Sequence, residues 1–362
     1  MQISAAVLRS KDGPYALEQV ELAEPVADEV LVRIVGVGMC HTDVLPRADV
    51  SFSPPPIITG HEGAGVVEAI GADVTGVEVG DHVVLSFDSC GACPACAADH
   101  PAHCETFLLR NLLGRRLDFT TGVVDSAGAE VSSRWFGQSS FATHAMATSR
   151  NVVVVDKALP LEKLGPLGCG IQTGAGSVLV AMDVQPRTSI VVFGAGAVGL
   201  AGVMAAVVAE ASTIVAVDLH EHRLDLALEL GATHAIDGAA TDLVAQIQTL
   251  TGGGANYALD TTGVPAVMLN ALGALRLGGV AGFVGIQTGD VVLDGSALIG
   301  KTAIGILEGN TDPHSFIPRM IELWQAGRFP FDRLIEEFPL DAINEAEEAS
   351  LSGRVIKPVL RP

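Results

Sequence analysis

The chain has 362 residues, which suggests two domains at about 150 residues each. With 49% hydrophobic and 17% charged residues, it is too apolar for a disordered protein. The net charge of −21 disfavours binding to nucleic acid or to an acidic membrane surface. The longest apolar stretch, 191–208, is interrupted by glycines. We therefore expect no transmembrane span. The first residues lack the charged-then-apolar layout of a signal peptide, so we expect none and a cytoplasmic location.

Short apolar runs separated by Gly, Pro and Asp predict a β-rich region over residues 1–160. Its strands are expected near 5–9, 29–38, 63–71 and 81–86. Residues 105–140 show no regular pattern and are predicted to be irregular.

Four of the six cysteines follow the spacing C-x2-C-x2-C-x7-C, which is typical of a closed tetrahedral zinc site. A disulfide framework is a poor interpretation for a large intracellular chain. Redox thiols and an iron–sulfur cluster remain alternatives. His100 and His103 lie in the same loop, but four thiolates already fill the shell. The predicted structural ligands are Cys90, Cys93, Cys96 and Cys104.

The other two cysteines lie far apart, Cys40 in GMCHTD and Cys169 in PLGCGIQTGAGS. Between them, GHEGAG contains His61. Two cysteines and one histidine form a known catalytic zinc set that leaves one position for water or substrate. The alternative is that both cysteines are small buried hydrophobic residues. Spacing alone does not decide between the two.

From about residue 170 the pattern changes to alternating strands and helices. A strand, a glycine turn and a helix are predicted over 189–210. This alternation indicates an α/β domain, a doubly wound parallel sheet with helices on both faces. The remaining elements are predicted as a strand at 213–218, helices at 222–231 and around 240–250, a strand near 257–259, a helix near 265–277, a strand at 280–284, a helix at 317–327 and short strands ending at 355–360.

The turn after the first of these strands reads Gly194-Ala195-Gly196-Ala197-Val198-Gly199, which matches G-x-G-x-x-G. Its place between a strand and a helix is the context that a dinucleotide fingerprint requires. Asp218 ends the next strand and would hold the adenosine ribose, selecting NAD because a 2′-phosphate would meet like charge. Arg223 would moderate this repulsion or contact the ribose. Alternatively, Asp218 is only a polar strand end.

The motifs CHTD, GHEGAGVVE, the four-cysteine loop, Gly168-Cys169-Gly170 and the glycine fingerprint occur in that order. With these motifs in this order, the chain resembles the zinc-dependent medium-chain alcohol dehydrogenases over essentially its whole length. Within that family, FGQSSFATHA and GPLGCGIQTGAGSVL are similar to the aryl-alcohol (benzyl alcohol) dehydrogenases.

The resemblance implies a GroES-like β-rich catalytic zinc domain of residues 1–170 and 309–362, and a Rossmann NAD-binding domain of residues 171–308. It also implies two zinc ions per subunit, NAD as cofactor, and a homodimer or homotetramer. The apolar segment 279–307, read as strand-rich, is the expected interface, although a buried core strand would look the same.

The resemblance also assigns roles to single residues. His41 and Lys357 could instead be an exposed turn histidine and an ordinary strand-end lysine. The implied roles are catalytic zinc on Cys40, His61 and Cys169, transient ligation by Glu62, orientation of His61 by Asp43, a hydrogen bond from Thr42 to the substrate oxygen, nicotinamide contacts by Thr173 and Val198, and pyrophosphate contacts by His41 and Lys357.

The expected reaction is the reversible oxidation of primary aromatic alcohols to aldehydes, with hydride transfer to NAD. Many relatives place a relay histidine three residues after the threonine, where this chain has Leu45. We therefore expect His41 or water to accept the proton. The candidates for an apolar substrate lining are Phe87, Trp135, Phe136 and Ile286.

Other functions stay open. Geraniol-like or long-chain alcohols are not excluded as substrates. Arg115 and Arg116 leave room for a glutathione-dependent formaldehyde dehydrogenase, which needs cationic groups. A nucleotide-sensing protein without catalysis should lack part of the metal set. A zinc-ribbon nucleic-acid binder rests on the four-cysteine loop alone and conflicts with the net charge.

Overall fold

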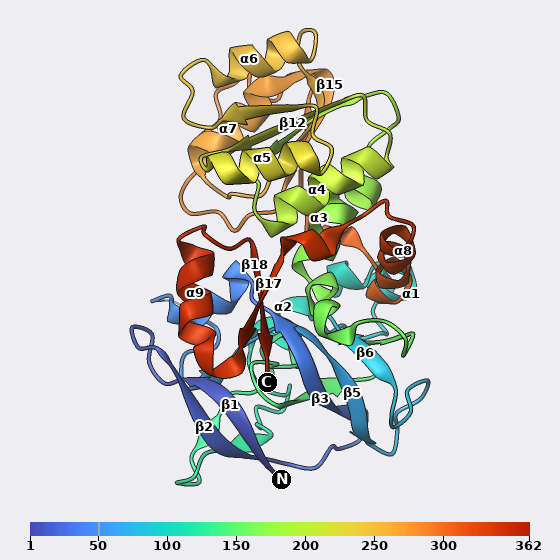
Figure 1. The fold of residues 1–362 in the computed structure, drawn as a ribbon, viewed down its shortest axis with the longest axis vertical. Coiled ribbons are helices and arrows are strands. Elements are labelled where there is room, and N and C mark those ends of the chain that lie inside the picture. Colours follow the sequence, from blue (N-terminus) through green and yellow to red (C-terminus); the bar gives the residue numbers. More distant parts are fainter. Residues whose placement is uncertain (50) are drawn as a thin grey trace. The chain divides into compact units, whose positions relative to one another are not determined.

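The computed structural model describes residues 1–49 and 51–362 and divides them into two compact units (Figure 1). Unit 1 contains residues Met1–Cys169, Asp312–Pro318 and Asp332–Pro362. Unit 2 contains Gly170–Thr311 and Arg319–Phe331. The third crossing between the units, from Pro318 to Arg319, falls inside helix α8 (Pro313–Gln325), whereas the predicted division kept all of 309–362 together. Within the described ranges, no helix is long and apolar enough to cross a bilayer.

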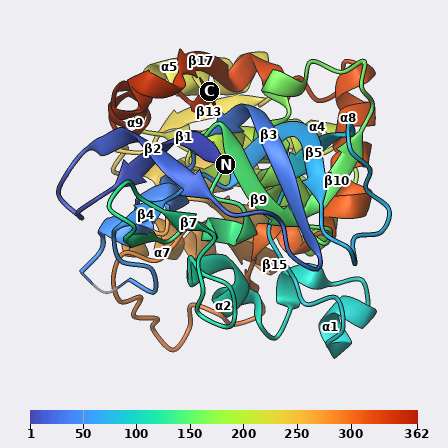
Figure 2. The same cartoon turned by 90° about the horizontal axis from the view of Figure 1, so that it is seen from below.

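Unit 1 is built on two sheets, which Figure 2 shows from below. The first has the strand order β4-β1-β2-β7-β8, and the second has the order β10-β6-β5-β3-β18-β17 with β9 also paired to β3. The strands are β1 (Gln2–Leu8), β2 (Tyr15–Leu22), β3 (Glu29–Gly38), β4 (Ile57–Ile58), β5 (Glu62–Ile70), β6 (His82–Leu85), β7 (Val123–Val124), β8 (Glu130–Val131), β9 (His144–Thr148), β10 (Val152–Val155), β17 (Ile335–Pro339) and β18 (Lys357–Arg361).

Strand β3 is the centre of the second sheet. It is buried along most of its length because β5, β9 and β18 all pair with it. Its pairing with β18 joins the two ends of the chain, so the red C-terminal strands lie beside the blue β3 in Figure 1. The short helices of this unit are α1 (Pro94–Ala97), α2 (Phe107–Leu112) and α9 (Ile343–Leu351).

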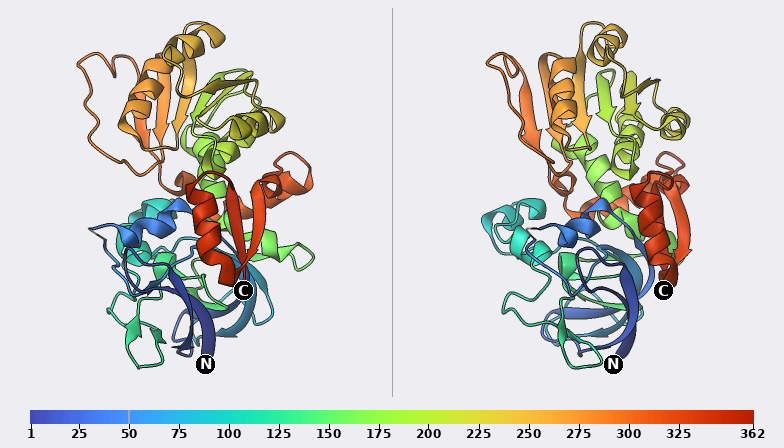
Figure 3. Two further views of the ribbon diagram at one scale, coloured as in Figure 1. Left: turned by 60° about the vertical axis from the view of Figure 1, so that its left-hand side comes forward. Right: turned by 90° about the vertical axis from the view of Figure 1, so that its left-hand side faces the viewer.

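Unit 2 has one parallel sheet of order β13-β12-β11-β14-β15-β16, with helices on both faces (Figure 3). This confirms the predicted doubly wound sheet, whose order reverses between β11 and β14. Its elements are α3 (Gly170–Gly176), β11 (Ser189–Phe193), α4 (Ala197–Val208), β12 (Thr213–Asp218), α5 (Glu221–Glu229), β13 (His234–Asp237), α6 (Leu243–Leu250), β14 (Ala255–Asp260), α7 (Pro265–Ala274), β15 (Leu275–Phe283) and β16 (Thr302–Gly305).

Three local predictions were wrong. Residues 105–140 are not wholly irregular, because α2 forms there and buries Phe107 and Asn111. The helix predicted to 277 ends at Ala274, since Leu275 already pairs with Ala255 of β14 as the start of β15. Segment 279–307 is not strand-rich throughout. Residues 284–301, which include several glycines and aspartates, form no strand between β15 and β16.

Candidate metal centres and nucleotide site

Cys40, His61, Glu62 and Cys169 converge in unit 1, with one ligand atom of each lying within 4.8 Å of the others. Cys40 precedes the 3₁₀ helix η1 (His41–Arg47), and Cys169 follows a second 3₁₀ helix of residues Gly165–Gly168. His61 directly precedes β5, and Glu62, the first residue of that strand, pairs with Gly38 of β3. Strand pairing therefore gathers residues that are far apart in the sequence.

Hydrogen bonding fixes the orientation of the His61 ring. Its Nδ1 lies 2.7 Å from Oδ1 of Asp43, whose carboxylate also accepts the backbone N–H of Cys40 at 3.1 Å and of Gly60 at 2.9 Å. The Nε2 atom is buried and has no hydrogen-bond partner in the described part of the chain. A histidine that donates one N–H to a carboxylate presents the lone pair of its other nitrogen to a metal.

The charge pattern also suits a cation. The hydrogen bond from Cys169 lowers the pKa of Cys40 well below its usual value, and the contributions of His61 and Lys357 outweigh the opposing effect of burial. Burial disfavours the charged form of His61, but the charge and hydrogen bond of Asp43 raise its pKa well above the ordinary value. Two thiols, an imidazole and a carboxylate are a donor set that zinc accepts.

Glu62 is held by a buried lysine. Nζ of Lys357 donates to both carboxylate oxygens at 2.9 Å and to the backbone oxygen of Met39 at 3.0 Å. Lys357 begins β18 and is 2% exposed. The pyrophosphate contact expected of Lys357 stays a prediction, and the structure gives the lysine a different, internal partner. No sequence pattern had linked these two residues.

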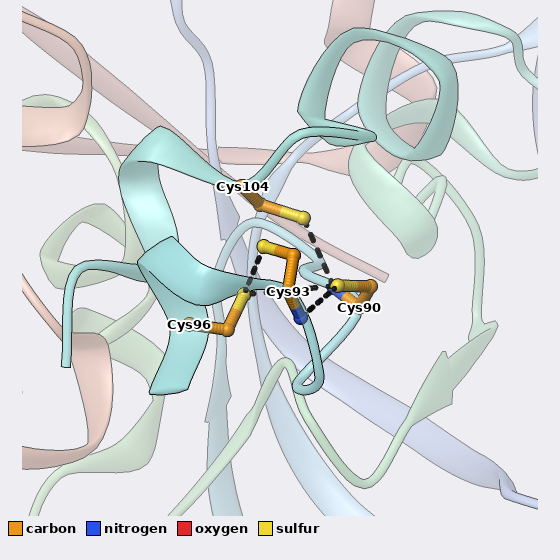
Figure 4. Close-up of side chains that lie close together, drawn as sticks. All are labelled: Cys90, Cys93, Cys96 and Cys104. Atoms are coloured by element: carbon orange, nitrogen blue, oxygen red, sulfur yellow. Dashed lines mark hydrogen bonds between the residues drawn. The ribbon is translucent and has the colours of Figure 1, made fainter. Parts of the chain in front are cut away.

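The four remaining cysteines form a separate group in unit 1 (Figure 4). Sγ of Cys96 lies 3.9 Å from Sγ of Cys90 and 3.5 Å from Sγ of Cys93. Four sulfurs bound to one tetrahedral zinc at about 2.3 Å stand about 3.8 Å apart. The backbone N–H groups of Ala92 and Cys93 donate to Sγ of Cys90 at 3.4 and 3.2 Å, and that of Cys90 donates to Sγ of Cys104 at 3.2 Å.

These contacts fit four thiolates around one ion, because N–H donors stabilise anionic sulfur. Donation by Ala92 and Cys93 lowers the pKa of Cys90 to about 6. Neither His100 nor His103 belongs to this group or to any other ligand group found among the described residues.

In unit 2 the glycine fingerprint forms the turn between β11 and α4. Gly194 has φ +87°, and a Cβ on Gly199 would fall 1.7 Å from the backbone oxygen of Gly194. At Gly196 the nearest atom to an added Cβ is Nη1 of Arg223, at 4.0 Å. The first and third glycines are thus required by the turn and the close packing, and the second leaves space for a phosphate.

Asp218 lies at the end of β12, beside this turn. Its carboxylate accepts the backbone N–H of Ala195 at 2.6 Å and of His220 at 2.9 Å, and Nη1 of Arg223 lies 3.9 Å away. The carboxylate is therefore fixed in place next to the fingerprint. Contact with a ribose stays a prediction.

The other predicted residues fall in both units. His41 is exposed and Thr42 half-buried at the start of η1, while Val198 lies in the first turn of α4. Thr173 of α3 donates to Oε2 of Glu308 at 3.3 Å. Ile286 is 53% exposed, in the segment between β15 and β16.

Three of the four predicted lining residues form a buried cluster near the first metal group. The Phe136 ring stacks on the His61 ring at a centroid distance of 4.4 Å, and Trp135 and Phe107 contact Phe136 edge to face. Phe87 in turn packs on Phe107 at 5.5 Å.

Sequence reasoning assigned no role to Gln138, which follows this aromatic pair. Its amide donates to the backbone oxygens of His61 and Ser86 and accepts the N–H of Gly63, so it holds the backbone on both sides of Glu62. The motif FGQSSF was distinctive in the sequence and was the only available signal.

The comparisons with known proteins agree with these features. An alcohol dehydrogenase GroES-like domain matches residues 26–157, and a zinc-binding dehydrogenase domain matches residues 197–325. The geraniol dehydrogenase of Castellaniella defragrans is 48% identical over 361 residues, covering 98% of this chain and 96% of that protein.

Two solved structures match the fold of this chain over its full length. The benzyl alcohol dehydrogenase from Acinetobacter calcoaceticus has a TM-score of 0.96 at 43% identity, and an alcohol dehydrogenase zinc-binding domain protein from Burkholderia ambifaria has 0.97 at 46%. Each match covers 100% of this chain and 99% of the other. Members of the family use Zn²⁺ and NAD and typically carry two zinc ions. The chain therefore belongs to the zinc-binding medium-chain alcohol dehydrogenase family and is a zinc-dependent alcohol dehydrogenase.

Proposed function

We propose that this enzyme catalyses the reversible oxidation of primary aromatic alcohols to aldehydes with NAD. The observation that carries the substrate class is the buried aromatic cluster around His61, above all the stacking of Phe136 on the imidazole at 4.4 Å. Flat rings favour offset or edge-to-face contact with other rings, which suits a benzyl group. The similarity to a benzyl alcohol dehydrogenase supports the same class.

Cys40, His61 and Cys169 would hold the catalytic zinc, with Glu62 beside them. When bound, the zinc lowers the pKa of an alcohol and NAD takes up a hydride. The protein's own contribution is orientation: Asp43 fixes the His61 ring, and the phenylalanine excludes water from one face of it. The proposed cofactor residues are the fingerprint glycines, Asp218 and Arg223, with Thr173 and Val198 toward the nicotinamide.

Thr42 and His41 are adjacent on η1, one half-buried and the other exposed. We assign the substrate hydrogen bond to Thr42 and the outward proton transfer to His41 or water. Leu45, at the position of the usual relay histidine, packs against the apolar core and offers no route for a proton. His41→Gln should slow proton release and change the pH profile of hydride transfer.

A second candidate, oxidation of geraniol-like alcohols, is favoured by the geraniol dehydrogenase at 48% identity. A glutathione-dependent activity would need Arg115 and Arg116 to bind an acidic substrate, but both are already paired with carboxylates of this chain. Arg115 bonds Glu130 at 2.6 Å, and Arg116 bonds Glu29 at 2.6 and 2.9 Å.

The deciding experiment compares kcat/KM for benzyl alcohol, geraniol, ethanol, and formaldehyde with glutathione, using NAD and NADP in turn. The proposal expects benzyl alcohol with NAD to lead. Phe136→Leu should reduce kcat/KM for benzyl alcohol more than for geraniol. Equal losses for both substrates, or a lead for geraniol in the unmodified enzyme, would favour the second candidate.

We also propose a homodimer or homotetramer. Strand β16 is the last strand of its sheet, and among residues 1–49 and 51–362 no strand pairs with its outer edge. Exposed apolar side chains accompany it, among them Leu277, Val292 and Ile299. Light scattering on the purified enzyme measures the mass directly. A monomer at micromolar concentration would contradict this assignment.

A further inference from the structure

The carboxylate of Glu62 and the ammonium of Lys357 form a buried ion pair inside the first metal group. The side chains are 0% and 3% exposed, and Nζ contacts both carboxylate oxygens at 2.9 Å. A buried ion pair loses its hydration on both sides, so it contributes little net stability compared with apolar residues. Its position beside Cys40, His61 and Cys169 suggests a role in the site itself.

Glu62 has two competing partners. It belongs to the set whose ligand atoms lie within 4.8 Å of one another, so it is within reach as a fourth ligand. A zinc with four protein ligands is closed, whereas a catalytic zinc keeps one position for substrate. A carboxylate whose two oxygens both accept from an ammonium is a weaker metal ligand. The partner of Glu62 thus decides which kind of site forms.

The surroundings confine the carboxylate to this place. A Cβ on Gly38 would lie 2.0 Å from Oε2 of Glu62, so the glycine provides the room that the carboxylate occupies. A Cβ on Gly165 would lie 2.1 Å from the backbone oxygen of Glu62, so the backbone is packed closely as well. Glu62 therefore does not reach solvent by a simple rotation.

Lys357 is also bound to the segment that leads into Cys40. Besides Glu62, its Nζ donates at 3.0 Å to the backbone oxygen of Met39, the residue before Cys40. Strand β18, which Lys357 begins, pairs with β3 through Val359 and Gly38. The lysine is thus tied to the strand end from which Cys40 follows.

We propose that Lys357 is a positioning residue that holds Glu62 away from the catalytic metal and so keeps one coordination position open. This rests on the proposed role of Cys40, His61 and Cys169 as ligands. In its absence, Glu62 would become a permanent fourth ligand and the site would turn from an open into a closed one.

The test uses enzyme with Co²⁺ in the catalytic site and imidazole as a probe of the open position, followed by visible absorption. Lys357→Met should weaken imidazole binding at least about tenfold, the lower range for outer-shell changes at metal sites. Lys357→Arg should keep the affinity, because it also donates to a carboxylate. The double variant Lys357→Met with Glu62→Gln should recover it, because the amide is a poorer ligand.

Arg116→Met is the matched control. It also removes the cation that donates to both oxygens of a buried carboxylate, that of Glu29, while Arg134 stays 3.4 Å away. Glu29 lies in neither ligand group. Imidazole affinity should not change in this variant. Circular dichroism and thermal unfolding show whether each variant is folded.

Unchanged imidazole binding in folded Lys357→Met would overturn the proposal, and so would a double variant as weak as the single one. If Lys357→Met does not fold, Glu62→Gln alone decides. Its affinity should equal that of the unmodified enzyme, and a tenfold tighter affinity would show that Glu62 already blocks the position. Failure of the underlying assignment looks different: Cys40→Ser would then leave the Co²⁺ content and spectrum unchanged.

Discussion

The two cysteine-containing groups of unit 1 achieve a metal-binding geometry in opposite ways. In the loop of residues 90–104, all four ligands come from one short segment, and backbone N–H groups donate directly to sulfur. In the group of Cys40, His61, Glu62 and Cys169, the ligands come from three distant segments that strand pairing brings together.

The groups also differ in what surrounds the ligands. Cys90, Cys93 and Cys96 are only half-buried, whereas His61 and Glu62 are fully buried and are held by the side chains of Asp43 and Lys357. Local geometry is thus enough for the proposed closed site, in which the metal would hold the loop together. A site that must keep a position open needs additional charged residues to hold its ligands in place.

The largest expected effect is a loss of activity when the group of Cys40, His61, Glu62 and Cys169 is altered. His61→Ala should lower kcat/KM about 10³-fold, because it removes a ligand of the site that supplies several kcal/mol of transition-state stabilisation. Metal analysis should show one zinc per chain instead of two. A variant that keeps two zinc ions, or most of its activity, would place the catalytic metal elsewhere.

Cys104→Ser should act mainly on stability. Loss of the loop metal and of its sulfur contacts should cost about 3 kcal/mol of unfolding free energy, the upper end for ordinary substitutions, because metal loss is among the more damaging changes. Zinc should again fall to one per chain, while kcat below the unfolding temperature is retained. If this variant loses kcat as severely as His61→Ala does, the two groups do not differ in function as proposed.

Asp43→Asn probes the side chains that hold the buried group. The amide keeps the shape but loses the charge that faces Nδ1 of His61, so metal affinity or activity should fall about 10–100-fold. Asp125→Asn removes the same charge from an exposed ion pair with Arg9 and is the control, with no change expected. Chelator competition measures the affinity in both variants.

The smallest effect concerns the metal-free loop. Donation by Ala92 and Cys93 lowers the pKa of Cys90 to about 6, so its thiolate persists above that pH, whereas a thiol of ordinary pKa is mostly protonated at pH 7. Iodoacetamide should therefore modify Cys90 in metal-free enzyme at pH 7, with the rate falling as the pH drops below about 6. Mass spectrometry of the modified peptide checks this, and zinc should protect it.

The same contrast explains how much could be predicted from sequence. The cysteine loop and the glycine fingerprint depend on short spacings. The longer strands, such as β3, β5, β11 and β12, follow from apolar runs between turns. The pairing of Glu62 with Lys357 joins residues from opposite ends of the chain and leaves no local pattern. Helix α3 was missed because its glycines disfavour a helix. One of them, Gly174, is required by tertiary packing, since a Cβ there would lie 2.0 Å from the backbone oxygen of Val198.

The insertion of β18 beside β3 has a consequence for biosynthesis. The chain is made from its N-terminus, so the loop of residues 90–104 is complete long before unit 2 is translated. Lys357 is translated 295 positions after Glu62, once unit 2 has been made. Until then Glu62 would lack its ammonium partner, and a zinc ion that arrived early would meet all four proposed ligands. If Lys357 holds Glu62 as proposed, the order of translation would favour a closed metal site on the nascent chain, which the arrival of β18 would convert into an open one.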